Sequence, residues 1–131
     1  MTDRLLIGGD QVIPTLRGED AIADMQAQHG DRLAVSMLDF TDTAAIREFV
    51  DDAFDRMGPN DVAVSNAGYG LFGAAQETDA QIDYQVAANR TGSIQFVRAA
   101  IPHLRQRGGG RIVQLSTARA GGGSININKV R

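Results

Sequence analysis

Short apolar runs alternate with amphipathic stretches along most of the chain, which is the pattern of an α/β protein. The apolar runs predict strands at residues 11–16, 33–38, 61–65 and 111–115. Pro14 places the first of these at a sheet edge or in a distorted position, because proline cannot donate to a ladder. Strands separated by helical segments predict a parallel sheet that is covered on both faces by helices.

Helical spacing of apolar residues predicts the segments between the strands. Residues 19–29 form the first of these helices, which ends at Gly30. Thr41 or Asp42 can cap the next helix, which stops at Gly58 and Pro59. Its apolar face comprises Ala45, Ile46, Phe49, Val50, Ala53, Phe54 and Met57.

A long helical region is predicted at residues 79–107, ending at the glycines 108–110. Gly92 and Pro102 should divide or bend it. Its apolar positions are Ile82, Val86, Ile94, Phe96, Val97, Ala100 and Ile101.

Both ends of the chain allow two interpretations. Residues 3–8 are either the last turns of a helix capped by glycine or a short strand in a hairpin. Residues 124–130 alternate polar and apolar side chains, which indicates either a half-exposed strand or a frayed tail. No internal repeat or second domain is evident, so residues 1–131 are predicted to form a single domain.

Composition narrows the classes of function. A net charge of −3 argues against a nucleic-acid partner, which would require a basic face. The absence of cysteine excludes disulfides, thiolate catalysis and cysteine-ligated metal, and no metal site is predicted. The apolar stretch near the N-terminus is too short for a signal peptide, and the uncharged run 62–76 is too short for a membrane span. These features favour a soluble, cytoplasmic protein without a membrane partner.

The run Asp61–Ser65 passes directly into a small, glycine-bearing turn at residues 66–70. Ligands of open α/β sheets bind at the carboxyl ends of the strands. This turn is therefore where a binding site is expected to begin.

Several short motifs then carry a resemblance to a family. They are the acidic stretch 38–42, the triplet Asn66-Ala67-Gly68, the pair Asn89 and Gly92, and the segment 111–117. In this order and at these spacings the chain resembles the short-chain dehydrogenase/reductase family over most of residues 9–117. The resemblance implies a Rossmann-like doubly wound parallel sheet. It also implies NADP or NAD as cofactor, a small carbonyl or alcohol substrate, and an oxidoreductase that transfers hydride.

The chain also departs from the family pattern. The family opens with a strand and a Thr-Gly-x-x-x-Gly-x-Gly turn, whereas this chain has only the pair Gly8 and Gly9. The family's Tyr-x-x-x-Lys motif follows the catalytic serine, whereas the tyrosines here, Tyr69 and Tyr84, lie upstream of it. The chain thus resembles a family member truncated at both ends, with a partial fold that lacks the first strand and the C-terminal part.

By resemblance, the missing first strand lies in the middle of the sheet, between the family's second and fourth strands. Its absence would leave open strand edges, which are unfavourable. The candidates to fill the gap are residues 5–7, residues 125–130, direct contact between the second and fourth strands, and another chain.

The resemblance assigns cofactor contacts to residues at the strand ends. Asp39 would lie near the adenine, together with the backbone around Phe40, although Asp39 could equally be a turn residue. Asn66 would border the adenosine ribose, or else tie neighbouring strands together, while Ala67 and Gly68 would let the nucleotide approach the backbone. Arg17 matches the position of a cation for the 2′-phosphate of NADP, or is a solvated surface arginine.

The catalytic positions implied by the resemblance are Asn89, Ser116 and Thr117. The family's catalytic serine aligns better with Thr117 than with Ser116, and either hydroxyl could donate to a carbonyl. Asn89 matches an asparagine that bends the helix and supports a water linked to the catalytic lysine, so a structural role is expected where that lysine is missing. His29 and His103 are interpreted as surface residues.

General acid/base catalysis requires a group with a suitably tuned pKa, and no Tyr-x-x-x-Lys pair is present. The chain is therefore predicted not to transfer hydride by itself. The alternative is a non-catalytic α/β module, either a nucleotide binder or an interaction domain. Such a module could form homo-oligomers through the helical region 79–107.

Overall fold

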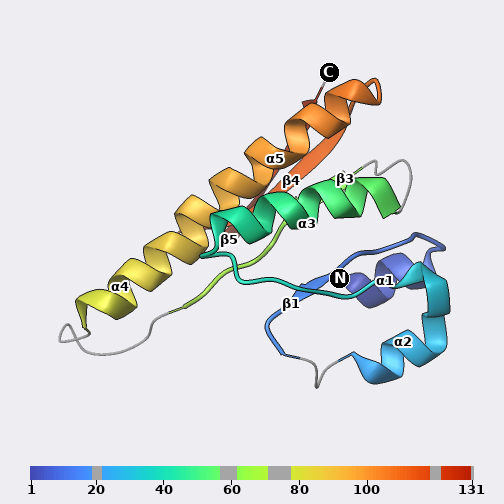
Figure 1. Cartoon of the computed structure of the whole chain (residues 1–131), viewed down its shortest axis with the longest axis horizontal. Coiled ribbons are helices and arrows are strands. Elements are labelled where there is room, and N and C mark those ends of the chain that lie inside the picture. Colours follow the sequence, from blue (N-terminus) through green and yellow to red (C-terminus); the bar gives the residue numbers. More distant parts are fainter. Residues whose placement is uncertain (19–21, 57–61, 71–77, 119–121, 131) are drawn as a thin grey trace. The chain divides into compact units, whose positions relative to one another are not determined.

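The computed structural model describes residues 1–18, 22–56, 62–70, 78–118 and 122–130 (Figure 1). It comprises two compact units, Met1–Asp39 and Phe40–Arg131, here called the N-terminal and C-terminal units. Each contains helices and parallel strands that alternate along the chain, as the hydrophobic pattern predicts.

The N-terminal unit contains helices α1 (Thr2–Ile7) and α2 (Ala23–His29), a short 3₁₀ turn η1 (Gly30–Arg32), and strands β1 (Thr15–Leu16) and β2 (Ser36–Met37). The strands pair in parallel, with Thr15 opposite Ser36. Both are shorter than predicted, yet backbone hydrogen bonds link residues 12–16 to residues 32–38. The core consists of Leu6, Ile22 and Leu33 with Val12, Leu16, Met25 and Val35 packed around it.

The N-terminal ambiguity is resolved in favour of the helix, so the hairpin interpretation is wrong. The amide of Gly8 donates to the Arg4 carbonyl at 3.1 Å and that of Gly9 donates to the Leu6 carbonyl at 3.1 Å. Gly9 has a φ of 95°, a conformation that glycine adopts without strain. Because Leu5–Ile7 are helical, they cannot act as the missing strand.

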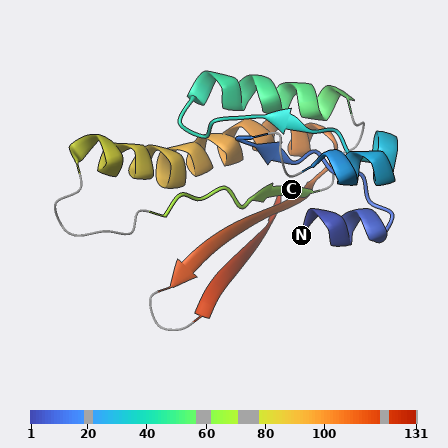
Figure 2. The ribbon, with the colours of Figure 1, turned by 90° about the horizontal axis from the view of Figure 1, so that it is seen from below.

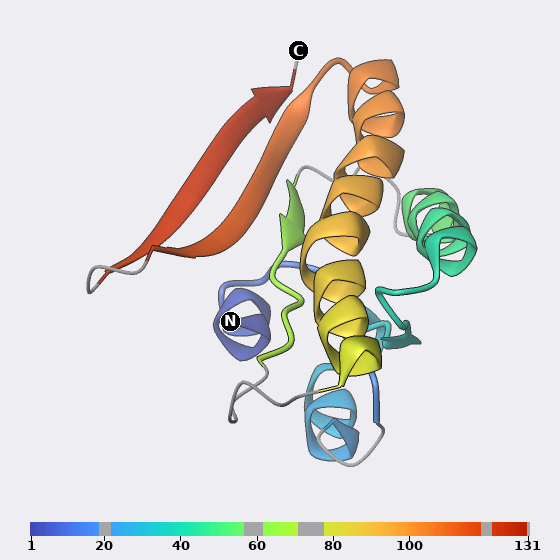
Figure 3. The ribbon, with the colours of Figure 1, turned by 90° about the vertical axis from the view of Figure 1, so that its left-hand side faces the viewer.

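The C-terminal unit contains α3 (Thr43–Arg56), β3 (Val62–Ser65), α4 (Asp79–Val86), a π-helical turn η2 (Ala87–Gly92), α5 (Ser93–Gln106), β4 (Gly110–Ala118) and β5 (Gly122–Val130). The sheet order is β3-β4-β5, with β3 parallel and β5 antiparallel to β4. Helix α5 packs on β3 and β4, and α3 packs beside α5 (Figure 3).

Helix α3 follows the prediction closely. The Asp42 carboxylate accepts hydrogen bonds from the amides of Ala44 (2.9 Å) and Ala45 (3.0 Å), so Asp42 caps the helix. Its buried face consists of Ile46, Val50, Ala53 and Phe54. The predicted contribution of Met57 and the stop at Gly58 and Pro59 lie outside the described residues.

The long helical region is continuous from α4 through η2 into α5. The expected interruption at Gly92 takes the form of the π-helical turn, which ends at this residue. The helix is not divided at Pro102, which lies inside α5. Gly108 and Gly109, with φ of 90° and 125°, end it as predicted.

The C-terminal segment is a strand, so the interpretation as a frayed tail is wrong. Strand β5 forms a hairpin with β4 (Figure 2) and pairs with the edge of β4 that faces away from β3. Residues 125–130 therefore do not take the place of the missing strand. The described strands form separate sheets, β1-β2 and β3-β4-β5, and β4 is the one described strand that pairs with β3.

Candidate functional site at the strand ends

The carboxyl ends of β3 and β4 lie at one edge of the C-terminal sheet. The parallel register places Ser65, the last residue of β3, opposite Gln114. Asn66, Ala67 and Gly68 follow immediately, and Ser116 lies two residues beyond Gln114. The predicted cofactor turn and the predicted catalytic hydroxyl thus both lie beyond the carboxyl end of the β3–β4 pairing, the edge at which open α/β folds bind ligands.

The loop after β3 is fixed to the π-helical turn by the side chain of Asn89. Its Oδ1 accepts a hydrogen bond from the Tyr69 amide at 2.6 Å, and its Nδ2 donates to the Tyr69 carbonyl at 2.7 Å. The amide thereby satisfies both backbone groups of one residue, as a neighbouring strand would. Asn89 is a positioning residue for the turn at residues 66–70.

Gly92 allows the same helical turn to approach the start of the C-terminal unit. A Cβ at this position would overlap the carbonyl oxygen of Phe40 and lie 3.1 Å from the Phe40 Cβ. The Phe40 ring is buried against Phe96, with centroids 5.9 Å apart. Its side chain is therefore a core element, which leaves the Phe40 backbone as the part that could border an adenine.

The turn that carries the predicted ribose contacts is open to solvent. Asn66, Ala67 and Gly68 are all exposed, in contrast to Ser65, which is completely buried. Among the described residues, a Cβ added at Gly68 would meet only the Asn89 Oδ1 within 4 Å, at 3.8 Å. The exposed backbone here fits the adenosine half of a nicotinamide dinucleotide, which requires close approach.

No corresponding fit exists for the pyrophosphate among the described residues. Gly8 and Gly9 end helix α1 and precede β1, whereas a phosphate cradle lies between a strand and the N-terminus of the following helix. The glycine pair is thus a helix cap.

Ser116 and Thr117 lie within a strand and not in a loop. Strand β4 continues beyond its predicted end, and the backbones of Ser116 and Thr117 pair with Ser124 and Gly123 of β5. Ser116 is exposed. Its hydroxyl is therefore presented from the hairpin, at a position fixed by strand pairing.

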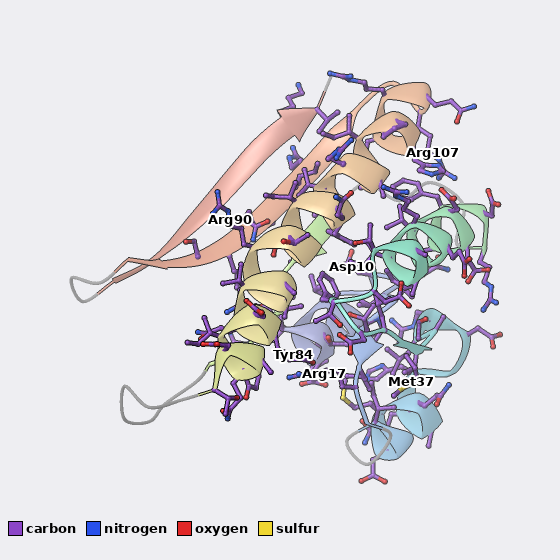
Figure 4. The ribbon with its side chains drawn as sticks, turned by 60° about the vertical axis from the view of Figure 1, so that its left-hand side comes forward. Asp10, Arg17, Met37, Tyr84, Arg90 and Arg107 are labelled. Atoms are coloured by element: carbon purple, nitrogen blue, oxygen red, sulfur yellow. The ribbon has the colours of Figure 1, made fainter. Side chains whose placement is uncertain are left out.

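The remaining predicted cofactor residues belong to the N-terminal unit. Arg17 directly follows β1, and Asp39 follows β2 and Leu38; both are exposed (Figure 4 labels Arg17). Because β1 and β2 are parallel, both residues lie at the carboxyl edge of their sheet. The other candidates, Phe40, Asn66, Ala67, Gly68, Asn89, Ser116 and Thr117, belong to the C-terminal unit.

Sequence reasoning missed the part played by the tyrosines. The rings of Tyr69 and Tyr84 meet edge to face, with centroids 5.3 Å apart and planes at 86°. Tyr84 lies on α4 (Figure 4), so this contact supports the loop from a second position on the long helix. Tyr84 and Asn89 lie little more than one helical turn apart on the predicted long helix. This spacing was the signal in the sequence that both side chains could contact the same loop.

The histidines, interpreted as surface residues, are only partly exposed. The His29 side chain is only 11% exposed, and its buried Nδ1 has no hydrogen-bond partner among the described residues. The His103 side chain is 24% exposed, bonds Asp51 at 2.7 Å and stacks on Phe54. Both lie on helices, where the periodicity of neighbouring apolar residues could have indicated that they are partly covered.

Within the described residues, no helix is long and apolar enough to cross a bilayer. The same part of the chain brings together no group of three or more His, Asp or Glu side chains that could hold a metal ion.

Comparison with known proteins extends the geometric argument. The family model of the short chain dehydrogenases matches residues 1–128. The oxidoreductase BOA17 of Botryotinia fuckeliana is 32% identical over 120 residues, which are 89% of this chain and 43% of that protein. The NADP-dependent 3-hydroxy acid dehydrogenase YdfG of Escherichia coli is 28% identical over 119 residues, 89% of this chain and 48% of YdfG.

Solved structures give the same result. A short-chain dehydrogenase from Streptomyces avermitilis superposes with a TM-score of 0.80 at 33% identity, over 88% of this chain and 44% of that structure. The closed form of serine dehydrogenase complexed with NADP⁺ gives a TM-score of 0.71 at 27% identity, over 86% and 46% of the two chains. The chain thus spans less than half the length of these relatives and has a Rossmann-like fold.

Proposed function

We propose, since the chain belongs to the short-chain dehydrogenase family, that its strand-end loops bind NADP or NAD as part of an oxidoreductase site. The observation that carries the proposal is the exposed Asn66–Gly68 turn, which Asn89 holds at the carboxyl edge of β3 through both backbone groups of Tyr69. A turn fixed in this way binds a nucleotide without first having to be ordered.

Different residues contact different parts of the cofactor. Asn66 borders the adenosine ribose, and Ala67 and Gly68 permit close approach of the nucleotide to the backbone. Asp39 and the backbone of Phe40 contact the adenine. Arg17 pairs with the 2′-phosphate of NADP, because a guanidinium matches the geometry of a phosphate. The naming of YdfG as NADP-dependent supports a preference for the phosphorylated nucleotide.

The substrate side lies at the end of β4. When bound, the nicotinamide would exchange hydride with the carbinol carbon of a small carbonyl or alcohol compound. The hydroxyl of Thr117 or Ser116 donates a hydrogen bond to the substrate oxygen and orients it. Asn89 acts through the loop that it positions.

Proton transfer to that oxygen requires a further group. Residues 1–131 contain no Tyr-x-x-x-Lys sequence to supply it. We therefore propose that the polypeptide of these residues binds the nucleotide without catalysing turnover.

Fluorescence of NADPH tests binding directly, since the chain contains no tryptophan to interfere with the signal. Saturable enhancement is expected, and Asn66→Ala should weaken it about tenfold, the effect of one good polar contact. Gln106→Ala, an exposed substitution at the end of α5, is the control and should leave affinity unchanged. The absence of saturable binding to the folded chain would contradict the proposal.

Arg17→Ala should weaken NADPH binding about tenfold and leave NADH binding unchanged, because only NADPH carries the 2′-phosphate. Arg4→Ala, an exposed arginine of the same unit, serves as the control. Equal losses for both nucleotides would contradict the assignment of Arg17.

A second candidate function is association of copies of the chain through the helical region Asp79–Arg107. The supporting observation is that Ile82, Val86 and Ile94 on this region are 47%, 50% and 50% exposed. Exposed apolar side chains close together mark interaction surfaces. Light scattering should show a dimer or larger assembly that Ile82→Asp with Val86→Asp dissociates, whereas Ala80→Asp does not; a monomeric chain would contradict it.

A further inference from the structure

A groove of about 380 Å³ lies between helices α3 and α5 of the C-terminal unit. These helices lie side by side in Figures 1 and 3 and pack directly on each other. The lining residues are Arg47 and Asp51 from α3 and Gln95, Arg98, Ala99, Pro102 and His103 from α5. The volume is in the range of small-molecule sites.

Two guanidinium groups give the groove its chemical character. Arg47 and Arg98 are exposed, and neither makes an ion pair within the described part of the chain. Two other arginines on or just after these helices are engaged within the protein. Arg56 pairs with Asp52 at 2.7 Å, and Arg107 donates to the Phe54 carbonyl at 2.5 Å. The arginines that line the groove therefore keep their donors available for a ligand.

The acidic residue of the groove is already engaged. His103 Nε2 lies 2.7 Å from Asp51 Oδ1, and the imidazole stacks on Phe54 with centroids 4.7 Å apart and planes at 17°. With neutral His103, the lining residues carry one net positive charge, whereas the whole chain carries −3. The groove is thus a local positive site on an acidic protein.

We propose that this groove binds a small molecule with an oxyanionic group, a phosphate monoester or a carboxylate, between Arg47 and Arg98. A guanidinium fork matches either group in a bidentate manner, and two forks from different helices can bind one anion from both sides. Gln95 supplies an uncharged amide, and Ala99 and Pro102 form a surface for the apolar part of the ligand.

Calorimetric titration of the full chain tests the proposal, with inorganic phosphate and succinate as probes at constant ionic strength. Saturable binding is expected, and Arg47→Ala or Arg98→Ala should each weaken it about tenfold or more through loss of a charge-assisted contact. Arg105→Ala is a matched control, because Arg105 is exposed on the same helix and is not among the lining residues. It should leave affinity unchanged.

The outcomes separate the alternatives. Binding of phosphate alone assigns a phosphate monoester, and binding of succinate alone or of both probes assigns a carboxylate or a general oxyanion ligand. Arg47→Lys retains the charge but not the fork, so an intermediate affinity supports bidentate contact. The proposal is overturned if neither probe saturates, or if Arg105→Ala weakens binding as much as Arg47→Ala does.

Discussion

The two strand ends that form the candidate site are held in different ways. After β3 the chain leaves the sheet at once, and side-chain hydrogen bonds from Asn89 fix the loop. Beyond Gln114, the β4 residue opposite Ser65, the chain remains a strand and is held by backbone pairing with β5. The first arrangement exposes backbone to a ligand, whereas the second presents side chains from a ladder that extends to Ala118.

This difference implies that the two ends can be disturbed independently. The β3 turn depends on the packing of the long helix, and the β4 segment depends on its hairpin. Substitutions in one should leave the other intact, because sites without shared partners have additive effects.

The largest effect is expected for Gly92→Ala. The new Cβ would overlap the Phe40 backbone, so the π-helical turn and Phe40 must move apart, at a cost of about 3 kcal/mol. Urea denaturation measures the loss. Gly68→Ala is the matched control: its Cβ meets one atom of the described residues, at 3.8 Å, and its cost should stay below about 1 kcal/mol. Equal costs would show that the approach of Phe40 to Gly92 is not needed.

Asn89→Ala should have the next largest effect. It removes the hydrogen bonds of Asn89 to the amide and carbonyl of Tyr69, at a cost of about 2 kcal/mol. Hydrogen exchange should speed up at Tyr69 and stay unchanged in the hairpin. Arg90→Ala, an exposed neighbour on the same turn (Figure 4), should change stability by less than about 0.5 kcal/mol. Faster exchange throughout β4 would contradict the independence of the two ends.

The β4 end is disturbed by proline in its partner strand. Neighbouring residues of an antiparallel edge strand alternate between N–H groups that face the ladder and N–H groups that face away. Asn126→Pro and Ile127→Pro therefore differ in effect. One of them should remove a hydrogen bond of the β4–β5 ladder and lower the free energy of unfolding by about 1 kcal/mol, whereas the other should lower it by less. Hydrogen exchange along β4 measures both. Unchanged protection in both variants would contradict the hairpin.

The smallest effect is expected for Ser65→Ala. The Ser65 side chain is fully buried, and its hydroxyl has no partner among the described residues. Removal of an unsatisfied hydroxyl should change stability by less than about 1 kcal/mol, with stabilisation the expected direction. Thermal unfolding measures it. A loss clearly above this value would mean that the hydroxyl has a partner in solution.

Local signals in the sequence were sufficient to predict most of the elements. Apolar periodicity predicted α3, and the short polar side chain of Asp42 marked its start. The triplet at residues 66–68 located the turn after β3, because small residues and a preceding apolar run are visible without knowledge of distant contacts.

The features that were missed depend on contacts between distant residues. Hydrogen bonds join the Asn89 side chain to the Tyr69 backbone, and the His103 side chain to Asp51. Neither pair is close in sequence, so helical periodicity could indicate that Asn89 and His103 are partly covered, but not which residues they contact. The pairing of β4 with β5 could likewise not be predicted, because alternating polar and apolar residues at 124–130 fit a strand of any sheet or a tail.

The π-helical turn also determines which way the long helix faces. An α-helix rotates by about 100° per residue, so a turn that holds an additional residue rotates everything before it by about that angle. Among the described residues, α5 buries Phe96, Ala100 and Leu104, whereas α4 buries none. One continuous helix thus supplies two surfaces, an inner one for the sheet and an outer one that carries Ile82 and Val86.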